Sequence, residues 1–380
     1  MKKLLDYCSV SGSSVKNFSN EKKYIATGDV INNKVVSFEN VTYENKPSRA
    51  NQLAETDEIL FAKMKDTLKV LLIDDELSEN IYSTGFFVIK ANKDVVPKYL
   101  YWLFNSSKFN QDKDKNSKGA TQQAINLEGL NKILIKDIPN LEEQKKIIDK
   151  IEKAFEIIEL KKKQLQDLDE LIKSQFVEMF GDVGKNDKNW KYTTLGKECF
   201  LNPKKSELKN MNENFEVSFV AMPSISENGN IDTNIIKKYD DVKKGFTYFA
   251  ENDVLFAKIT PCMENGKGAV AVGLKNKIGF GSTEFHVLRP KENINSVWLY
   301  TLTAMKSFRI EAERKMTGSA GQKRVPISFF ETYNLGLPPI ELQNQFADIV
   351  KQIDKQKSEI QKSLKEMQNL QETLMNKYFG

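Results

Sequence analysis

Two long stretches of the chain carry apolar side chains at helical spacing. The first runs from Leu141 to Phe180 without proline or glycine, and the second runs from Ile340 to Phe379. Apolar residues three, four and seven positions apart line one face of each stretch, which predicts two amphipathic helices. Asn140 followed by Glu143 has the form of a capping pair, and Gly181 stands where a helix would stop. At 1.5 Å per residue, the first helix would be roughly 60 Å long.

The two apolar stripes predict that these helices pair as a coiled coil. Two long stripes in one chain most simply bury each other, and a two-fold-like arrangement would make the pair antiparallel. The alternative is that each helix folds back on its own neighbouring globule. The expected interface residues are Ile151, Phe155, Ile158, Leu165 and Ile172 in the first helix, and Val350, Ile353, Ile360, Leu364 and Met367 in the second.

The residues before each long helix have a different composition and a different spacing of apolar residues. Short β-branched and aromatic runs, such as residues 35–38 and 70–73, alternate with Gly, Asn and Asp, and one helical stretch is expected near residues 96–109. This mixture predicts an α+β globule.

The same motifs occur twice along the chain in the same order. The heptapeptide DEILFAK at Asp57–Lys63 returns as NDVLFAK at Asn252–Lys258, 195 positions later. Two further matches have an offset of 199 positions: Ser83–Ile89 with Ser282–Leu288, and Ile138–Gln144 with Leu337–Gln343. Such a period far exceeds the 20 to 50 residues of solenoid repeats, so we predict a duplicated module of domain size.

Together these patterns predict an α+β fold with an internal pseudo-two-fold duplication. Two similar globules, residues 1–139 and 182–338, are expected to be separated by two long helices, residues 140–181 and 339–380. The helices would form an antiparallel coiled coil.

Composition is consistent with globules that bury real cores. The chain has 380 residues, of which 40% are hydrophobic and 23 are Phe. Cys8, Cys199 and Cys262 are too few and too scattered for a disulfide framework or a zinc site. No apolar run is long enough to span a membrane, and Asp6 interrupts the start before a signal peptide could develop, so we expect a cytoplasmic protein with no membrane partner.

Charge indicates where a partner could bind. The chain carries a net charge of +5, and the two long helical stretches contribute none of this excess. Turn-rich stretches at residues 43–52 and 315–324 mix cations, hydroxyls and amides, the groups that contact phosphates and base edges. The alternative is that they are solvated loops that bind nothing. The candidate DNA contacts are Lys46, Ser48, Arg49, Lys63, Lys118, Gln122 and Gln123 in the first copy, and Lys258, Lys315, Thr317, Ser319, Gln322, Lys323 and Arg324 in the second.

No motif for catalysis is present. The sequence lacks an Asp- or Asn-Pro-Pro-aromatic tetrapeptide for adenine methylation and any glycine-rich nucleotide loop with the right spacing. His286, the only histidine, is expected to be a half-buried strand residue. We therefore predict no catalytic residues and no metal site.

The order of these parts resembles the DNA-specificity subunit of type I restriction-modification systems. The resemblance rests on the Gly-rich loop that ends in Gln322, the proline-led E-x-Q entry into each long helix, and STEFHVLRP at Ser282–Pro290. It implies that each globule is a target-recognition domain, each long helix is a spacer, and the chain binds a split sequence in double-stranded DNA. It also implies two methyltransferase subunits and optional motor-nuclease subunits as partners, with S-adenosylmethionine, ATP and Mg bound only by those partners.

Divergence between the copies predicts that the two half-sites differ. At the offset of 199, Gly119–Ile125 aligns with Gly318–Arg324, and both cations of the second loop are replaced in the first. Two half-sites about 34 Å apart would match one helical turn of DNA, with the helices as a ruler. Two readings from other classes remain open: a coiled-coil scaffold that binds only proteins, and a DNA enzyme with an unrecognised site.

Overall fold

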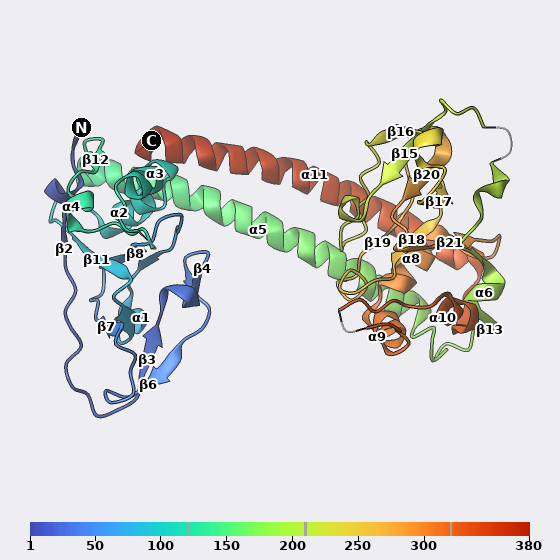
Figure 1. The fold of residues 1–380 in the computed structure, drawn as a ribbon, viewed down its shortest axis with the longest axis horizontal. Helices are drawn as coiled ribbons and strands as arrows, with labels where there is room; N and C mark the ends of the chain where they lie inside the picture. Colours follow the sequence, from blue (N-terminus) through green and yellow to red (C-terminus); the bar gives the residue numbers. More distant parts are fainter. Residues whose placement is uncertain (121, 209–210, 320) are drawn as a thin grey trace. The chain divides into compact units, whose positions relative to one another are not determined.

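The computed structural model describes residues 1–120, 122–208, 211–319 and 321–380. The chain forms two compact units, the first comprising Met1–Lys162 with Lys362–Gly380 and the second comprising Lys163–Gln361. The long helices α5 (Leu141–Phe180) and α11 (Ile340–Phe379) each have 40 residues and continue from one unit into the other (Figure 1).

The first unit holds two four-stranded sheets, with orders β2-β11-β8-β9 and β6-β3-β10-β7. All their neighbours are antiparallel except β3 and β10, which are parallel. The strands of the first sheet are β2 (Cys8–Val10), β11 (Phe86–Ala91), β8 (Ile59–Ala62) and β9 (Val70–Leu72), and those of the second are β6 (Glu39–Val41), β3 (Lys22–Ile25), β10 (Ile81–Ser83) and β7 (Ala50–Gln52). The short pairs are β1 (Lys2–Lys3) with β12 (Leu134–Ile135), and β4 (Val30–Ile31) with β5 (Lys34–Val35), and the short helices are α1 (Asp75–Ser78), α2 (Pro97–Phe104), α3 (Ser107–Lys115) and α4 (Leu127–Leu130).

The second unit repeats this topology, with sheet orders β14-β21-β18-β19 and β16-β15-β20-β17. The parallel contact recurs between β15 and β20. The strands are β14 (Cys199–Leu201), β21 (Phe285–Pro290), β18 (Val254–Ala257), β19 (Gly268–Val270), β16 (Ile236–Lys238), β15 (Glu216–Val220), β20 (Ile278–Gly281), β17 (Thr247–Ala250), and the pair β13 (Lys191–Thr194) with β22 (Asn334–Leu337). The helices are α6 (Leu195–Glu198), α7 (Tyr239–Val242), α8 (Ser296–Ala304), α9 (Lys306–Arg314) and α10 (Ile327–Thr332). The predicted duplication and mixed fold class are confirmed.

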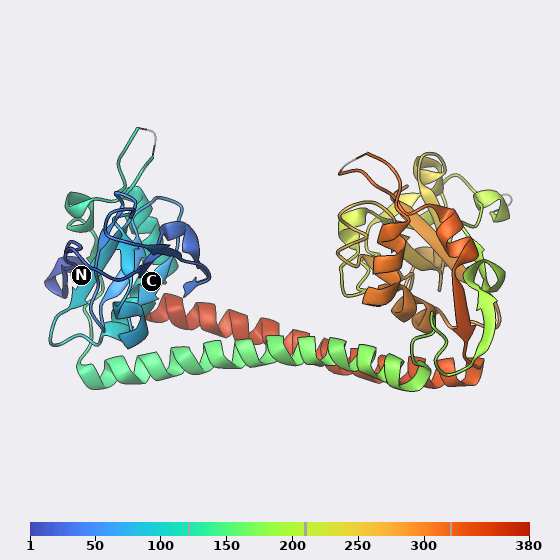
Figure 2. The ribbon, with the colours of Figure 1, turned by 90° about the horizontal axis from the view of Figure 1, so that it is seen from below.

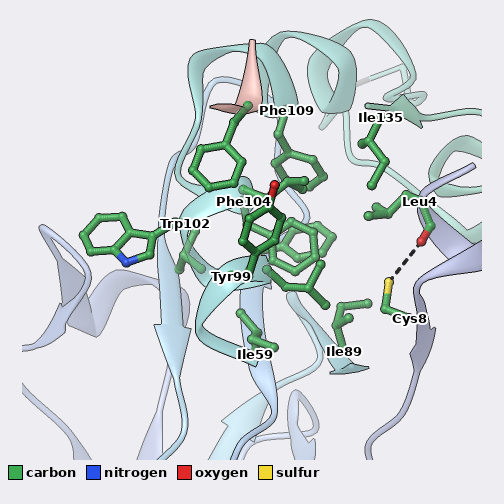
Figure 3. Close-up of a cluster of buried hydrophobic side chains, with 14 of the residues drawn as sticks. Leu4, Cys8, Ile59, Ile89, Tyr99, Trp102, Phe104, Phe109 and Ile135 are labelled. Carbon is green, nitrogen blue, oxygen red and sulfur yellow. Dashed lines mark hydrogen bonds between the residues drawn. The ribbon is translucent and has the colours of Figure 1, made fainter. Parts of the chain in front are cut away.

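The repeated heptapeptide forms the same core strand in both units. Its Leu-Phe-Ala segment lies in β8 and β18, which are buried throughout. Phe61 packs with its ring centroid 5.0 Å from that of Phe104, and Phe256 lies 5.1 Å from Phe330. Figure 3 shows the aromatic core of the first unit, where Tyr99, Phe104 and Phe109 gather. Core packing therefore explains why these residues recur.

The ends of α5 follow the predicted local signals. The side chain of Asn140 accepts a hydrogen bond from the backbone N–H of Glu143 at 3.0 Å, which caps the first turn. Gly181 has φ of 70°, the left-handed conformation in which glycine ends a helix at low cost.

The long helices pair antiparallel within the second unit. Lys357 of α11 lies 2.6 Å from Asp169 of α5, and Phe346 lies with its ring centroid 5.5 Å from that of Phe180. Numbering rises along one helix as it falls along the other, so the predicted direction is confirmed. In the first unit, Phe379 of α11 joins the same apolar core as Ile151 of α5.

The expected coiled-coil residues differ in burial and in surroundings. Ile151 and Phe155 contact the core of the first globule, where Phe155 stacks on Trp102 at 4.5 Å, so their partners are not confined to the other helix. Four expected residues are buried, namely Ile151, Ile158, Val350 and Ile353, and six are partly buried, namely Phe155, Leu165, Ile172, Ile360, Leu364 and Met367.

A buried glutamine joins the start of each long helix to its globule. Gln144 accepts from the backbone N–H of Val96 at 2.7 Å and donates to the carbonyls of Asp94 and Pro139, both at 2.8 Å. Gln343 repeats this pattern with Asn295 at 3.0 Å, Asn293 at 3.0 Å and Pro338 at 2.8 Å. The shared glutamine of the E-x-Q motif is therefore a structural joint.

Two local predictions in the first unit are wrong. The single helix expected near residues 96–109 is two helices, because Ser106 caps α3 by accepting from the backbone N–H of Phe109 at 3.1 Å. The strand expected at residues 35–38 ends at Val35, and Val36 and Phe38 are exposed. Their apolar character therefore signals no core strand.

Candidate nucleic-acid interface

Segments from three parts of the first unit meet beyond the ends of β8 and β10. The backbone N–H of Thr84, after β10, donates to Arg49 O at 2.9 Å. Lys63, after β8, donates its backbone N–H to Gly85 O at 2.9 Å and accepts from Ile125 N, also at 2.9 Å. The structure thus brings the backbone around Arg49, Lys63 and Ile125 together at one end of the unit. Figure 2 shows α5 running along one side of this unit.

Lys63 is half-buried within this end of the unit. Its ammonium donates to Thr84 O at 2.8 Å and lies 4.5 Å from the centre of the Phe87 ring. Burial lowers the pKa of Lys63. The side chain supports the turn after β10 and adds positive charge at the base of the surface.

The other predicted contacts of the first unit fall into two groups. Lys46 donates to Ala50 O at 2.9 Å, and Lys118 pairs with Glu128 at 3.2 Å. These two ammonium groups therefore already have partners within the protein. The remaining members, Ser48, Arg49, Gln122 and Gln123, are exposed, and so is Lys118.

The second unit builds the same end from its own residues. The backbone N–H of Lys258, after β18, donates to Glu284 O at 2.9 Å, and its carbonyl accepts from Val325 N at 2.9 Å. Burial lowers the pKa of Lys258, as it does for Lys63. Six further predicted contacts lie on or next to the adjoining loop: Lys315, Thr317, Ser319, Gln322, Lys323 and Arg324.

Arg324 and Glu284 form an ion pair in that loop. The Nε of Arg324 lies 3.0 Å from one carboxylate oxygen of Glu284, and its Nη2 lies 2.9 Å from the other. The guanidinium lowers the pKa of the Glu284 carboxyl, and the carboxylate raises the pKa of Arg324. About two-fifths of the Arg324 side chain and a quarter of the Glu284 side chain are exposed. The pair stands at the surface.

The loops of the two units differ in length by one residue. Lys118 bridges to Ala124 in the first unit, whereas Thr317 bridges to Arg324 in the second. The structural counterpart of Arg324 is therefore Ala124, and the constant offset that aligned it with Ile125 is wrong at this point. Thr121 and Ala320, which belong to these loops, lie outside the described residues.

His286 is a strand residue in β21, as expected, but it is buried rather than half-buried. Its Nε2 lies 2.8 Å from Val325 O, which can only accept, so Nε2 carries the proton. Its Nδ1 then accepts from the amide of Asn202 at 3.2 Å. Burial lowers the pKa of His286 to about 4, so the ring is neutral at physiological pH.

Residues 243–246 were not predicted as contacts, although sheet pairing brings them to this end of the second unit. β17 pairs Thr247 with Gly281, so residues 243–246 lie beside the turn after β20, much as residues 46–49 lie beside the turn after β10. Lys244 and Phe246 in that segment are exposed. A Lys-Lys-Gly turn just before a strand was the only signal that could have found it.

Buried cations hold the loop that follows each core strand. Lys113 donates to the carbonyls of Met64 at 2.8 Å and Thr67 at 2.5 Å. Arg309 donates to Met263 O at 3.0 Å and Gly266 O at 3.1 Å, and its burial lowers the pKa of this guanidinium to about 10. By donating to these backbone carbonyls, Lys113 and Arg309 hold the two loops in place.

Three further features concern the described residues. Within those ranges, no three His, Cys, Asp or Glu side chains gather as metal ligands would. No helix in the described parts of the chain is both long enough and apolar enough to cross a membrane. Burial raises the pKa values of Cys8 and Cys199 to about 12, so both thiols stay protonated.

Comparison with known proteins gives consistent matches. A model of the family described as "Type I restriction modification DNA specificity domain" matches residues 7–170 and 187–368. Two curated Escherichia coli proteins are similar over 193 residues, the type I restriction enzyme EcoAI specificity subunit with 42% identity and the EcoEI specificity subunit with 39%. Each match covers 49% of this chain and 32% of the relative, so it spans about a third of the relative's length.

Solved structures share the fold at low sequence identity. A chain from a study of complex assembly and conformational transition of the type I R-M system aligns with a TM-score of 0.63 and 22% identity, covering 99% of this chain and 96% of that one. The type I restriction-modification system S subunit from M. genitalium aligns with a TM-score of 0.52 and 13% identity, covering 100% and 95%.

Proposed function

Because the chain belongs to the family of type I restriction modification DNA specificity domains, we propose that it is the DNA-binding specificity subunit of a type I restriction-modification complex. The observation that carries this proposal is the repeated end of each unit. Cationic, hydroxyl and amide side chains adjoin Lys63 in one unit and Lys258 in the other, at equivalent places in the same topology. Such groups contact phosphates and base edges.

The two units would read different half-sites. Scaffold residues such as Gln144 and Gln343 match, but partly exposed positions differ: Gly85 corresponds to Glu284, and Ala124 corresponds to Arg324. Because base contacts specify sequence, different side chains imply different bases. The target would be bipartite and asymmetric.

The chain would act with catalytic partners rather than as an enzyme. We propose two methyltransferase subunits, and motor-nuclease subunits as optional additions, as its protein partners. S-adenosylmethionine, ATP and Mg would be bound by these partners, which would flip and methylate an adenine in each half-site. This work would take place in the cytoplasm, where the chromosomal DNA lies.

The long helices would fix the gap between the half-sites. α5 and α11 each continue from one unit into the other without a break. A continuous helix rises 1.5 Å per residue, so its number of residues sets the distance between the segments at its two ends. Helix length would therefore act as the ruler for the DNA spacer.

A binding measurement tests the proposal. The full chain, purified with methyltransferase subunits, is titrated with duplexes that carry or lack its selected split sequence, at several salt concentrations. We expect the binding constant to fall steeply with salt and to favour the split sequence by at least about a thousandfold. Equal binding to all duplexes, or no binding, would contradict the proposal.

A further inference from the structure

The guanidinium of Arg324 is held by Glu284 along its Nε–Nη2 edge and by one further contact at Nη1. Glu284 accepts from Nε and from Nη2, and the carbonyl of Gln322 accepts from Nη1 at 3.0 Å. An arginine has five N–H donors, one on Nε and two on each terminal nitrogen. Among the described residues, one donor on Nη1 and one on Nη2 therefore remain without a partner.

One free donor on each terminal nitrogen suits one base in particular. Guanine presents two acceptors, O6 and N7, side by side in the major groove, and a bidentate arginine is their commonest specific partner. Glu284 restrains the rotation of the guanidinium, so less conformational entropy is lost when a base binds. The carboxylate also offsets the positive charge, which favours discrimination between bases over attraction to any phosphate.

In the first unit, the backbone bridge at the base of the loop forms without such an ion pair. There Ala124 stands in place of Arg324 and Gly85 in place of Glu284, so both members are absent together. The backbone bridge from Lys118 to Ala124 forms nonetheless, with hydrogen bonds of 3.0 Å in both directions. The pair in the second unit is therefore additional to the scaffold.

We propose that Arg324 reads a guanine in the half-site bound by the second unit, and that Glu284 is its positioning residue. This inference rests on the proposed function, because it assigns part of the specificity of that same surface. The first unit, with Ala124 and Gly85, reads its half-site by other contacts.

The test is selection of bound sequences from a pool of random duplexes by the full chain purified with methyltransferase subunits. Wild-type protein, Arg324→Ala, Arg324→Lys and Glu284→Ala are compared, with Arg314→Ala as the matched control. Arg314 is an exposed cation at the end of α9, and its replacement removes the same charge nearby. Thermal unfolding of each variant confirms that it is folded.

We expect both Arg324 variants to lose the preference for guanine at one position of one half-site and to keep the rest of the motif. Affinity for the best wild-type sequence should fall by about tenfold to a hundredfold in Arg324→Ala. Glu284→Ala should weaken the same preference while it strengthens binding to unrelated duplexes, an increase that loss of a merely structural contact would not produce. Arg314→Ala should keep the wild-type motif.

The outcomes separate this inference from the proposed function. If wild-type protein selects no split sequence, the proposed function fails. If it selects one, and Arg324→Lys retains every base preference, the assignment of Arg324 is overturned while the proposed function stands.

Discussion

The ammonium of Lys357 lies 2.6 Å from the carboxylate of Asp169 and links α11 to α5 within the second unit. Lys357 is 8% exposed, which is unusual for a lysine. Asp354 lies 3.6 Å from the same ammonium. A charge buried between two amphipathic helices is costly unless it is paired, so this contact favours one register of the two helices.

Replacing Lys357 should destabilise the helix pair. Lys357→Ala leaves Asp169 partly buried without its partner, and we expect the free energy of unfolding to fall by about 1 to 3 kcal/mol. Chemical denaturation measures the change. The control is Lys355→Ala, which removes an exposed lysine of the same helix and should have little effect. Equal stability of the two variants would show that the pair does not hold the helices.

The buried glutamines Gln144 and Gln343 should contribute more to stability than an exposed glutamine does. Gln144→Ala or Gln343→Ala removes three hydrogen bonds and leaves backbone groups, most of them partly buried, without these partners, which should cost about 2 to 4 kcal/mol. Gln164→Ala, at an exposed site on α5, serves as the control. Thermal unfolding should show a clear loss for the first two variants, and an unchanged midpoint would refute the structural role.

Stability should depend on His286 in mildly acidic solution. Burial lowers the pKa of His286 to about 4, whereas in the unfolded chain it is near 6.5. Between these values the unfolded state binds the extra proton, so the free energy of unfolding falls as pH falls from 6.5 to 4, by at most about 1.4 kcal/mol per pH unit. Above pH 6.5 this contribution is fully present.

The variant His286→Gln isolates that effect, because glutamine does not titrate and can still donate to Val325 O. Carboxylates titrate in the same range in both proteins, so the informative quantity is the difference in slope. Denaturation series at pH 4.5 to 7 should show a shallower pH dependence in the variant. Identical slopes would mean that the pKa of His286 is the same in the folded and the unfolded chain.

Lengthening both long helices should lengthen the DNA spacer. One heptad inserted into each helix adds about 10 Å, or roughly three base pairs at 3.4 Å each. We expect the selected gap to grow by that amount while both half-sites stay the same. An unchanged gap would contradict the role of the helices as a ruler.

Long-range patterns predicted the large features of the fold well. The duplication was visible because buried strands such as Ile59–Ala62 and Val254–Ala257 keep their apolar identity. The long helices were visible because an amphipathic stripe has to persist through 40 residues. Asn140 and Gly181 then marked the ends of α5 through local chemistry.

Features that depend on tertiary pairing could not be predicted. The antiparallel contact between β17 and β20 joins distant segments, so nothing local placed Lys244 beside the second surface. A one-residue difference in loop length hid Ala124 as the counterpart of Arg324. The partner of Arg324, Glu284, was seen only as a difference from Gly85. The DNA-contact residues themselves stay predictions.

Methylome sequencing of a host that expresses this chain with methyltransferase subunits tests the central claim most directly. We predict one new modified motif with two different short half-sites and a gap of fixed length, present only when the chain and the methyltransferase are expressed together. Modification at a single continuous motif, or modification that does not depend on this chain, would contradict the claim that it supplies bipartite DNA specificity.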